Sequence, residues 1–435
     1  MRTATLPLAL AIVLTSACAS YPERLSEALE NFEAGDFEPA FVFMADEVDS
    51  PFLSGAEAGT VALTAGEWDL ARELFERAEI AAKDLEDRAV LGAEPLAEAV
   101  SSWVINDRTR TYQGEGFERV YVHTSLALTY LAEGRLSDVF VETRRANLLL
   151  EAEERLYETT YRAGGWGHLL SAIVYELLGE LDHAYIDYNR MVEKDVGTAI
   201  AGPALVRLAG RLGRTDDLAR WQERFGAARE LPEGAASVIV LAGVGLGPLK
   251  VEGSLTVPLP SGVYRMAVPD YERRPQLVSA LRLVDQETGV GARTELIEDV
   301  AEVARKNLAD RVGWIAARSA ARGALKLALT KQLEDEYGAA GWIAGSLYTI
   351  FTERADLRAW MTLPDSWQAC RLFVPPGERT LILDAVGGEL VRLGAFRLDP
   401  GETMFVFVRT LGQQAHVHVV GGVPIATTEN EVGSP

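Results

Sequence analysis

Apolar side chains recur at helical spacing from residue 21 to about residue 230. Within this stretch one arrangement repeats: a glycine, an aromatic residue or leucine two positions later, and a small residue five positions later. The clearest copy runs from Gly66 through Trp68, Ala71 and Phe75 to Ala78. Glycine permits the turn between two antiparallel helices, and the small residue lets the helices approach closely. The pattern therefore predicts a series of helical hairpins.

Four further copies are centred on Gly35, Gly134, Gly179 and Gly213, of which the first and last are weaker. Together with the clearest copy, these turn glycines are separated by 31, 68, 45 and 34 residues. The pattern resembles the tetratricopeptide repeat (TPR), whose period is about 34 residues, although the interval of 45 requires an insertion. We expect an all-α, TPR-like array over residues 18–230, with residues 107–116 projecting from it as a loop.

Near residue 230 the helical pattern gives way to short apolar and β-branched runs separated by Pro-Gly turns. Strands are predicted at residues 236–243, 251–258, 263–268, 277–285, 370–374, 380–385, 390–398, 404–409 and 416–420. Two long helical patterns, at 294–337 and 341–360, interrupt them. Residues 231–426 should therefore form an α+β domain with a mainly antiparallel sheet and a helical insertion at about 294–360. Residues 427–435 are predicted to form a loose polar tail. The two domains are expected to be modular, so that the helical domain should fold without residues 230–435.

The N-terminus has the pattern of a bacterial lipoprotein signal at residues 1–17. An apolar run at 6–14 is too short to span a bilayer, and small residues lead into Cys18. Thr15 stands where a typical lipobox has leucine. An ordinary secretory signal cut near Ala17 or Ala19 is the alternative. Lipidation of Cys18 predicts anchoring in the inner leaflet of the outer membrane, facing the periplasm, because no aspartate follows to retain the protein at the inner membrane.

Composition limits the classes of partner. The chain has 435 residues, which favours two or three domains, and a formal net charge of -22. Such an acidic chain repels phosphates, so nucleic-acid binding is discounted. It has two cysteines. If Cys18 is lipidated, Cys370 has no internal disulfide partner, and a buried structural thiol is the favoured interpretation there.

Three stretches together resemble a family of uncharacterised proteobacterial outer-membrane lipoproteins with TPR-like helices. The stretches are Val120-Tyr-Val-His-Thr-Ser-Leu-Ala-Leu-Thr-Tyr-Leu with Val141-Glu-Thr-Arg-Arg, the strand at Val238 with Gly247-Pro-Leu-Lys, and Thr352-Glu-Arg-Ala-Asp-Leu-Arg-Ala-Trp-Met-Thr-Leu-Pro. The likeness spans roughly residues 18 to 420. It implies a role as an envelope factor and carries over no biochemical activity, cofactor or site residue.

Several charged groups are candidates for partner binding. A basic stripe lies on one face of a predicted helix: Arg311, Arg318, Arg322 and Lys326. On a repeat helix, Glu142 and Arg145 are spaced to pair, and Arg144 or Arg145 could instead bind a partner's carboxylate. A further cluster predicts a salt-bridged junction between helix and sheet, closed by a tryptophan: Glu353, Arg354, Asp356, Arg358 and Trp360.

Signatures of catalysis are missing from the sequence. It contains no nucleophile elbow, phosphate-binding loop of the Walker type or His-Glu-x-x-His zinc motif. Gly243-Val-Gly-Leu-Gly is interpreted as a turn that ends a strand. His416 and His418 share a face of a predicted strand, and an exposed pair on an edge strand is favoured over a metal site. No catalytic residue, metal or cofactor is predicted.

The favoured function is that of a lipid-anchored periplasmic adaptor that binds protein partners in cell-envelope assembly through a TPR-like groove. The alternative is a glycan- or cell-wall-binding protein, or a hydrolase, that uses a cleft in the C-terminal domain. The sequence favours no particular partner, pathway or oligomeric state.

Overall fold

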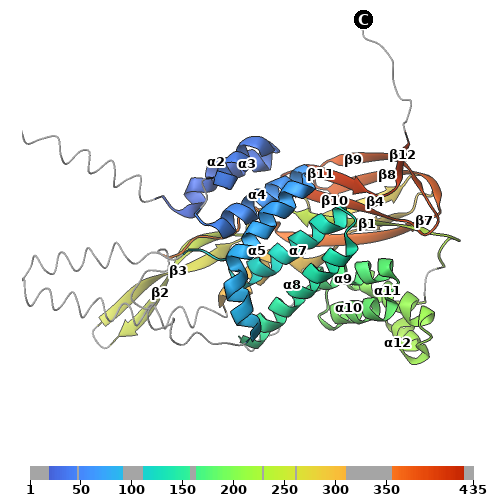
Figure 1. The fold of residues 1–435 in the computed structure, drawn as a ribbon, viewed down its shortest axis with the longest axis horizontal. Coiled ribbons are helices and arrows are strands. Elements are labelled where there is room, and N and C mark those ends of the chain that lie inside the picture. The colour runs from blue at the N-terminus through green and yellow to red at the C-terminus, as the bar shows by residue number, and fades with distance from the viewer. Residues whose placement is uncertain are drawn as a thin grey trace, which may run out of the picture.

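The computed structural model describes residues 19–46, 49–91, 111–156, 163–227, 230–259, 262–309 and 355–425. Their N-terminal part is a run of helices, and their C-terminal part is built mainly of strands (Figure 1). All strand pairs in the described ranges but one, that between β1 and β10, are antiparallel. The predicted fold class, a TPR-like helical array followed by an α+β part with mainly antiparallel pairing, is confirmed.

Within the described residues, consecutive helices of the array form five antiparallel pairs that stack on one another. The pairs are α2 (Tyr21–Ala34) with α3 (Phe37–Asp46), α4 (Pro51–Ala65) with α5 (Trp68–Leu91), α7 (Gly116–Ala132) with α8 (Leu136–Leu156), α9 (Gly165–Leu178) with α10 (Leu181–Glu193), and α11 (Thr198–Arg211) with α12 (Thr215–Phe225).

The five glycines of the repeat stand at the five turns between paired helices. Each has a positive φ, from 66° at Gly213 to 82° at Gly66, which residues with a side chain rarely adopt. The small or branched residue five positions later, such as Ala71 or Ala184, is fully buried in four of the five pairs. The repeat pattern thus located the hairpins correctly because both of its residue types are required by the turn and the helix contact.

The described residues of the C-terminal part contain two five-stranded sheets. The inner sheet has the order β11-β10-β1-β7-β6, and the outer sheet has the order β12-β9-β8-β4-β5. The strands are β1 (Ala236–Val244), β4 (Ala280–Asp285), β5 (Gly291–Arg293), β6 (Glu295–Asp299), β7 (Ser366–Val374), β8 (Gly377–Val386), β9 (Leu390–Leu398), β10 (Thr403–Leu411), β11 (Gln414–Val420) and β12 (Val423–Ile425). A separate hairpin, β2 (Leu249–Leu259) and β3 (Gly262–Glu272), extends away from the sheets (Figure 1).

The inner sheet is the middle layer of the molecule, between the helices and the outer sheet. Alternate residues of β1 point to opposite faces. Val238 and Val240 pack with the outer sheet in one apolar core. Ile239 and Leu241 belong to the other core, which the inner sheet shares with the helices. Trp68 of α5 meets Phe407 of β10 with ring centroids 5.4 Å apart. Helices and inner sheet therefore share one continuous core.

Two predictions about local structure are wrong. The helix predicted to begin at residue 294 begins at residue 300, because residues 295–299 form β6 and pair with β7. At its other end, residues 355–360 form neither helix nor strand, and residues 310–354 of the insertion lie outside the described residues. Residues 111–115 of the loop predicted at 107–116 do form a loop, but it does not project: Tyr112 is buried against Phe52, and α7 begins at Gly116. Contacts with distant parts of the chain override the local pattern in both places.

None of the helices within the described ranges combines the length and the apolar composition needed to cross a membrane.

Candidate functional site

A segment of the C-terminal part without regular secondary structure lies against the helical array. Residues 355–364, called the crossing segment below, contain neither helix nor strand. Three of their main-chain N–H groups donate to carboxylates of helix residues. Trp360 N donates to Glu118 Oε1 at 2.7 Å, while the N–H groups of Met361 and Thr362 donate to the two oxygens of Glu57 at 2.7 and 2.9 Å. The array thus binds a segment of its own chain that is neither helix nor strand.

Each of these carboxylates also accepts a hydrogen bond from a buried tyrosine. Tyr21 Oη donates to Glu57 at 3.1 Å, and Tyr112 Oη donates to Glu118 at 2.5 Å. Burial raises the pKa of both carboxyl groups, and that of Glu118 reaches about 7 because the hydrogen bonds offset desolvation only in part. The same burial holds the pKa of both tyrosines well above its usual range.

A third carboxylate repeats the arrangement farther along the array. Glu298 of β6 accepts hydrogen bonds from Tyr121 Oη at 2.8 Å and from the main-chain N–H groups of Gly164 and Trp166 at 3.0 Å each. Burial raises its pKa as well. Buried carboxylates of this kind are costly unless they are fully hydrogen-bonded, so these three groups fix how the helices and the sheet fit together.

Trp360 anchors the crossing segment. Its side chain is buried, and its indole Nε1 lies 3.0 Å from Thr60 Oγ1 and 3.1 Å from Thr362 Oγ1. Its ring centroid is 5.9 Å from that of Phe75 in α5. The prediction that Trp360 closes a junction between helix and sheet therefore agrees with its place in the structure.

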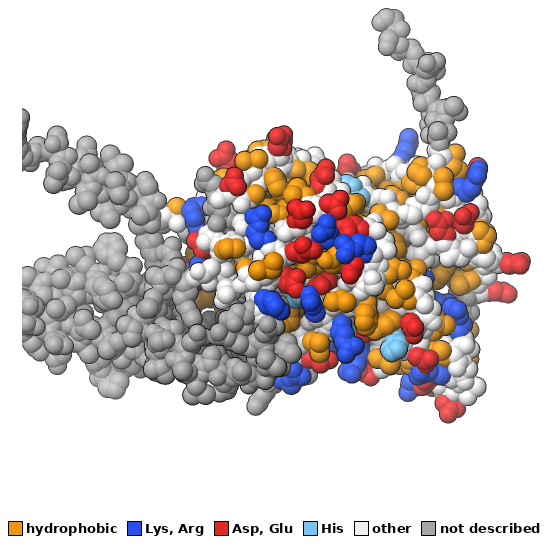
Figure 2. All heavy atoms as spheres, viewed as in Figure 1, with side chains coloured by type: hydrophobic (Ala, Val, Ile, Leu, Met, Phe, Trp, Pro, Cys, Tyr) orange, Lys and Arg blue, Asp and Glu red, His pale blue; other side chains and the backbone are white. Residues whose placement is uncertain are grey.

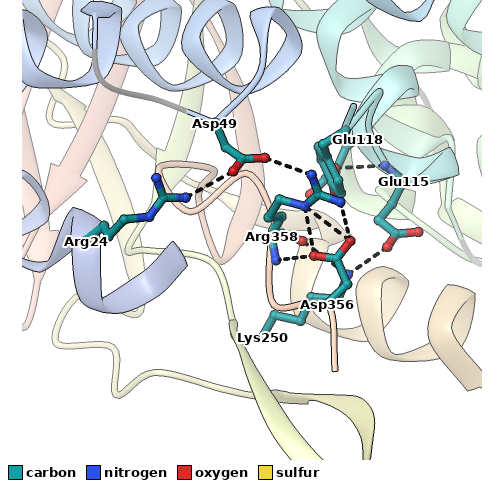
Figure 3. Close-up of polar contacts among 8 residues, drawn as sticks. Arg24, Asp49, Glu115, Glu118, Lys250, Asp356 and Arg358 are labelled. Carbon is teal, nitrogen blue, oxygen red and sulfur yellow. Dashed lines mark hydrogen bonds and ion pairs between the residues drawn. The ribbon is translucent and has the colours of Figure 1, made fainter. Parts of the chain in front are cut away.

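A network of ion pairs surrounds the start of the crossing segment (Figure 3). Arg358 binds Asp356 and Asp49, each at 2.7 Å, and Arg24 binds Asp49 at 3.1 Å. Lys250 donates to Glu115 at 2.7 Å and to the carbonyl of Arg358 at 3.1 Å. Asp356 and Arg358 thus form the predicted salt-bridged junction, while their predicted companions Glu353 and Arg354 lie outside the described residues.

The charged residues Glu142 and Arg145 of helix α8 pair with each other and with side chains of neighbouring helices. Arg145 donates to Glu142 at 3.1 Å, the pair that their spacing predicts, and also to Glu79 at 2.5 Å. Glu142 in turn lies 2.7 Å from His123 Nδ1. Glu79, His123 and Glu142 are close enough to hold a metal ion, but the guanidinium of Arg145 already provides the positive charge between the two carboxylates. Arg144 is exposed on α8.

A serine, a histidine and an aspartate come together between α9 and α10. His168 Nδ1 lies 2.9 Å from Asp187, and Ser171 Oγ donates to the other oxygen of Asp187 at 2.6 Å. A nucleophilic serine must instead donate its proton to the imidazole, so this connectivity does not activate Ser171.

The remaining predicted residues divide into two groups. The basic stripe (Arg311, Arg318, Arg322 and Lys326) and Cys18 lie outside the described residues. His416 and His418 do share one face of the edge strand β11, but both are half-buried against helix turns rather than exposed. Cys370 is buried, as predicted, and burial raises the pKa of its thiol to about 12. Gly245 stands in the predicted turn after β1, with a φ of 65°.

A cleft of about 640 Å³ opens where the last helix pair meets the sheets. One wall is the N-terminal half of α11, from Ala199 to Arg207. The other wall combines the end of β7, from Cys370 to Phe373, with β5 and the loop before it. Of the carboxylates that line the cleft, Glu295 is engaged by the main-chain N–H groups of Ala199 and Ile200 at 3.0 and 2.6 Å. The walls of the cleft thus come from both parts of the chain.

Sequence reasoning did not find the buried carboxylates or the cleft. A signal for Glu57 was present, since it is the single charged residue of α4, which is otherwise apolar and small. Glu118 and Glu298 carry no such signal, and the cleft depends on the contact between α11 and β7, which are separated by more than 150 residues in the chain.

Comparison with known proteins adds little. No protein-family model matches the chain, and no curated protein matches it. Among solved structures, the chain is similar to one described as a functional characterisation of Pseudomonas aeruginosa PilF, with 16% identity over 46% of this chain and 88% of that chain, and a TM-score of 0.23. A likeness at this TM-score carries no argument about function.

Proposed function

We propose that this protein is a non-catalytic adaptor, held at the periplasmic face of the outer membrane by a lipid on Cys18, that binds protein partners in cell-envelope assembly. Helix α2 begins at Tyr21, three residues after the lipidated position, so the folded body would sit directly at the membrane. Stacked helical hairpins are an architecture that commonly presents binding surfaces to other proteins.

The proposal rests on one observation: the protein's own chain covers one face of the helical array, whereas a cleft beside the last helix pair stays open to a partner. The face that packs on the inner sheet is closed, because the crossing segment occupies it through Glu57 and Glu118. The cleft between α11 and β7 is open and has walls from both parts of the chain. We therefore place the partner in this cleft rather than in the TPR-like groove that the sequence suggested.

Hydrolysis of a glycan would call for two carboxylates facing the same sugar. The two that line the cleft are Glu230 and Glu295, and Glu295 is occupied in capping α11. This arrangement favours protein binding over the alternative of a cell-wall hydrolase.

The test is site-specific photo-crosslinking in living cells, with the reactive amino acid placed at Arg293 in the cleft. Arg392, which is exposed on β9 away from the cleft, is the matched control position. We expect one envelope protein to crosslink at Arg293 and not at Arg392, and the product to be lost when Cys18→Ala releases the protein from the membrane. Identical products at the two positions, or none at Arg293, would contradict the adaptor.

A further inference from the structure

One end of β7 is paired by hydrogen bonds with a strand on one side only. Strand β1 pairs with the whole of β7, from Ser366 to Val374, whereas β6 pairs only with Ser366 to Ala369. Residues 370–374 therefore present a free edge of the inner sheet. Within the described ranges, no hydrogen bond reaches the main chain of these residues from the side of β6. Such an edge can pair with another extended chain.

This free edge forms part of the cleft rather than lying open on the surface. The opposite wall also offers main-chain groups. Pro203 lies inside α11 and has no N–H, so the carbonyl of Ala199 lacks its usual helical donor. Both Ala199 and Pro203 line the cleft. An extended peptide between the two walls would find main-chain partners along β7 and an acceptor on α11.

The charges in the cleft favour an acidic peptide. Arg207 and Arg371 share a single carboxylate, that of Glu176, at 2.7 and 2.8 Å. Arg293 is exposed at the rim. Glu295 is turned to the N-terminus of α11, and the remaining lining carboxylate, Glu230, is exposed on the chain that leads to β1. In a chain whose formal net charge is -22, the cleft thus has a wall where two guanidinium groups share one carboxylate.

We propose that the cleft binds an extended acidic segment of a partner protein, which adds to the inner sheet as a strand along residues 370–374 of β7. The inference rests on the proposed adaptor function and specifies how the partner binds. Because side chains of a strand alternate between its two faces, one set would pack beside Leu372, toward the apolar layer between the sheets. The other set would face Arg207 and Arg371, where acidic side chains pair best.

The experiment uses a fluorescent, acetylated peptide of alternating valine and glutamate, titrated into the full-length protein in detergent and followed by anisotropy. Two N-methylated versions of the peptide are compared. One is methylated at the amides of all valines and the other at the amides of all glutamates, so each blocks every second amide. Only one set of amides faces β7, so one version should lose about tenfold or more in affinity and the other should keep most of it. Replacing glutamate by lysine should also weaken binding.

Variants of the protein locate the binding. Ala199→Trp fills the cleft from an exposed position and should abolish binding, whereas Ala34→Trp, at an exposed position on α2, should not. Arg293→Glu should weaken binding about fivefold, and the control Arg392→Glu should not.

The outcomes separate this proposal from the adaptor itself. No saturable binding of the acidic peptide, equal effects of the two N-methylated versions, or full binding by Ala199→Trp would each overturn strand addition in the cleft. A crosslinked envelope protein at Arg293 would still support the adaptor in those cases. Strand addition would be supported if only one N-methylated peptide loses affinity and if Ala199→Trp abolishes binding of the unmodified peptide. This holds whichever protein is crosslinked.

Discussion

At the scale of single residues, the most informative groups are the three buried carboxylates. Glu57, Glu118 and Glu298 each join a tyrosine hydroxyl to main-chain N–H groups. Removing such a carboxylate leaves the N–H groups buried without partners, which costs more than the hydrogen bond itself contributes. These residues therefore act as fixed connectors between segments distant in sequence.

The raised pKa of Glu118 predicts how stability depends on pH. The folded protein binds a proton at this carboxyl more tightly than the unfolded chain does, because burial raises its pKa from 4.5 to about 7. The associated stability is fully present below about pH 4.5 and is lost as the pH rises to 7. We expect the free energy of unfolding to fall by up to about 3 kcal/mol across this range, measured by urea denaturation. Glu57 and Glu298 act in the same direction.

The control for this prediction is a pair of isosteric variants. Glu118→Gln cannot titrate, so its stability should depend less steeply on pH between 4.5 and 7 than that of the wild type. Glu27→Gln, at an exposed position on α2, should keep the wild-type dependence. If Glu118→Gln also keeps it, the dependence arises from the general acidity of the chain.

Two substitutions of Trp360 separate the contribution of its hydrogen bonds to stability from the contribution of its packing. Trp360→Phe removes the Nε1–H group that contacts Thr60 and Thr362 and should cost about 1–2 kcal/mol in the free energy of unfolding. Trp360→Ala also empties a buried site and should cost about 3–5 kcal/mol. Chemical denaturation measures both. Equal losses in the two variants would mean that the indole contributes through its N–H group alone.

At the scale of elements, strand β11 ties the sheet to the turns of the first two helix pairs. His416 meets the ring of Phe37 at 4.8 Å between centroids, beside the turn at Gly35. His418 lies 2.9 Å from the carbonyl of Thr64 and meets Trp68 at 5.3 Å, beside the turn at Gly66. The turns of the repeat therefore also serve as docking points for an edge strand, which covers part of that edge.

Substitutions at two turn glycines should reveal this docking. Alanine at Gly66 or Gly179 must adopt a positive φ, which costs about 1–2 kcal/mol in either turn. At Gly66 the new Cβ would also lie 2.5 Å from the ring of His418, whereas at Gly179 nothing is within 4 Å. We expect Gly66→Ala to lower the free energy of unfolding by about 1 kcal/mol more than Gly179→Ala, because the hydrogen bond to Thr64 is lost. Equal losses would show that β11 does not hold this turn.

The sequence predicts elements well where local chemistry decides them. The five turn glycines identify the helix pairs because a positive φ is a local requirement, and the Glu142–Arg145 pair follows from spacing on one helix. The non-helical form of residues 355–360 could not be predicted, since their apolar and charged residues also suit a helix. Their conformation depends on Glu57 and Glu118, which are more than 230 residues away in the chain. The cleft depends on distant contacts in the same way.

At the scale of the whole molecule, the face of the helical array that meets the inner sheet is a buried surface. Figure 2 shows the opposite, outward side of the helices, where Lys and Arg side chains are interspersed with Asp and Glu around scattered apolar residues. The apolar core runs from the helices into the inner sheet without interruption, through contacts such as that between Trp166 and Trp367, whose rings stack at 4.7 Å. The modular independence expected from sequence therefore has little physical support.

This shared core predicts the behaviour of separated halves. A fragment of residues 19–227 would expose the apolar face that meets Leu241 and Phe407, and would leave Glu57 and Glu118 buried without the N–H groups of the crossing segment. We expect it to retain helical circular dichroism but to melt without a cooperative transition, and to regain one when residues 230–435 are co-expressed with it. Residues 230–435 alone should aggregate, since the inner sheet would expose its helix-facing side. A fragment 19–227 that melts cooperatively at the temperature of the whole protein would restore the modular picture. In that case the crossing segment would be a detachable ligand of the array rather than part of its core.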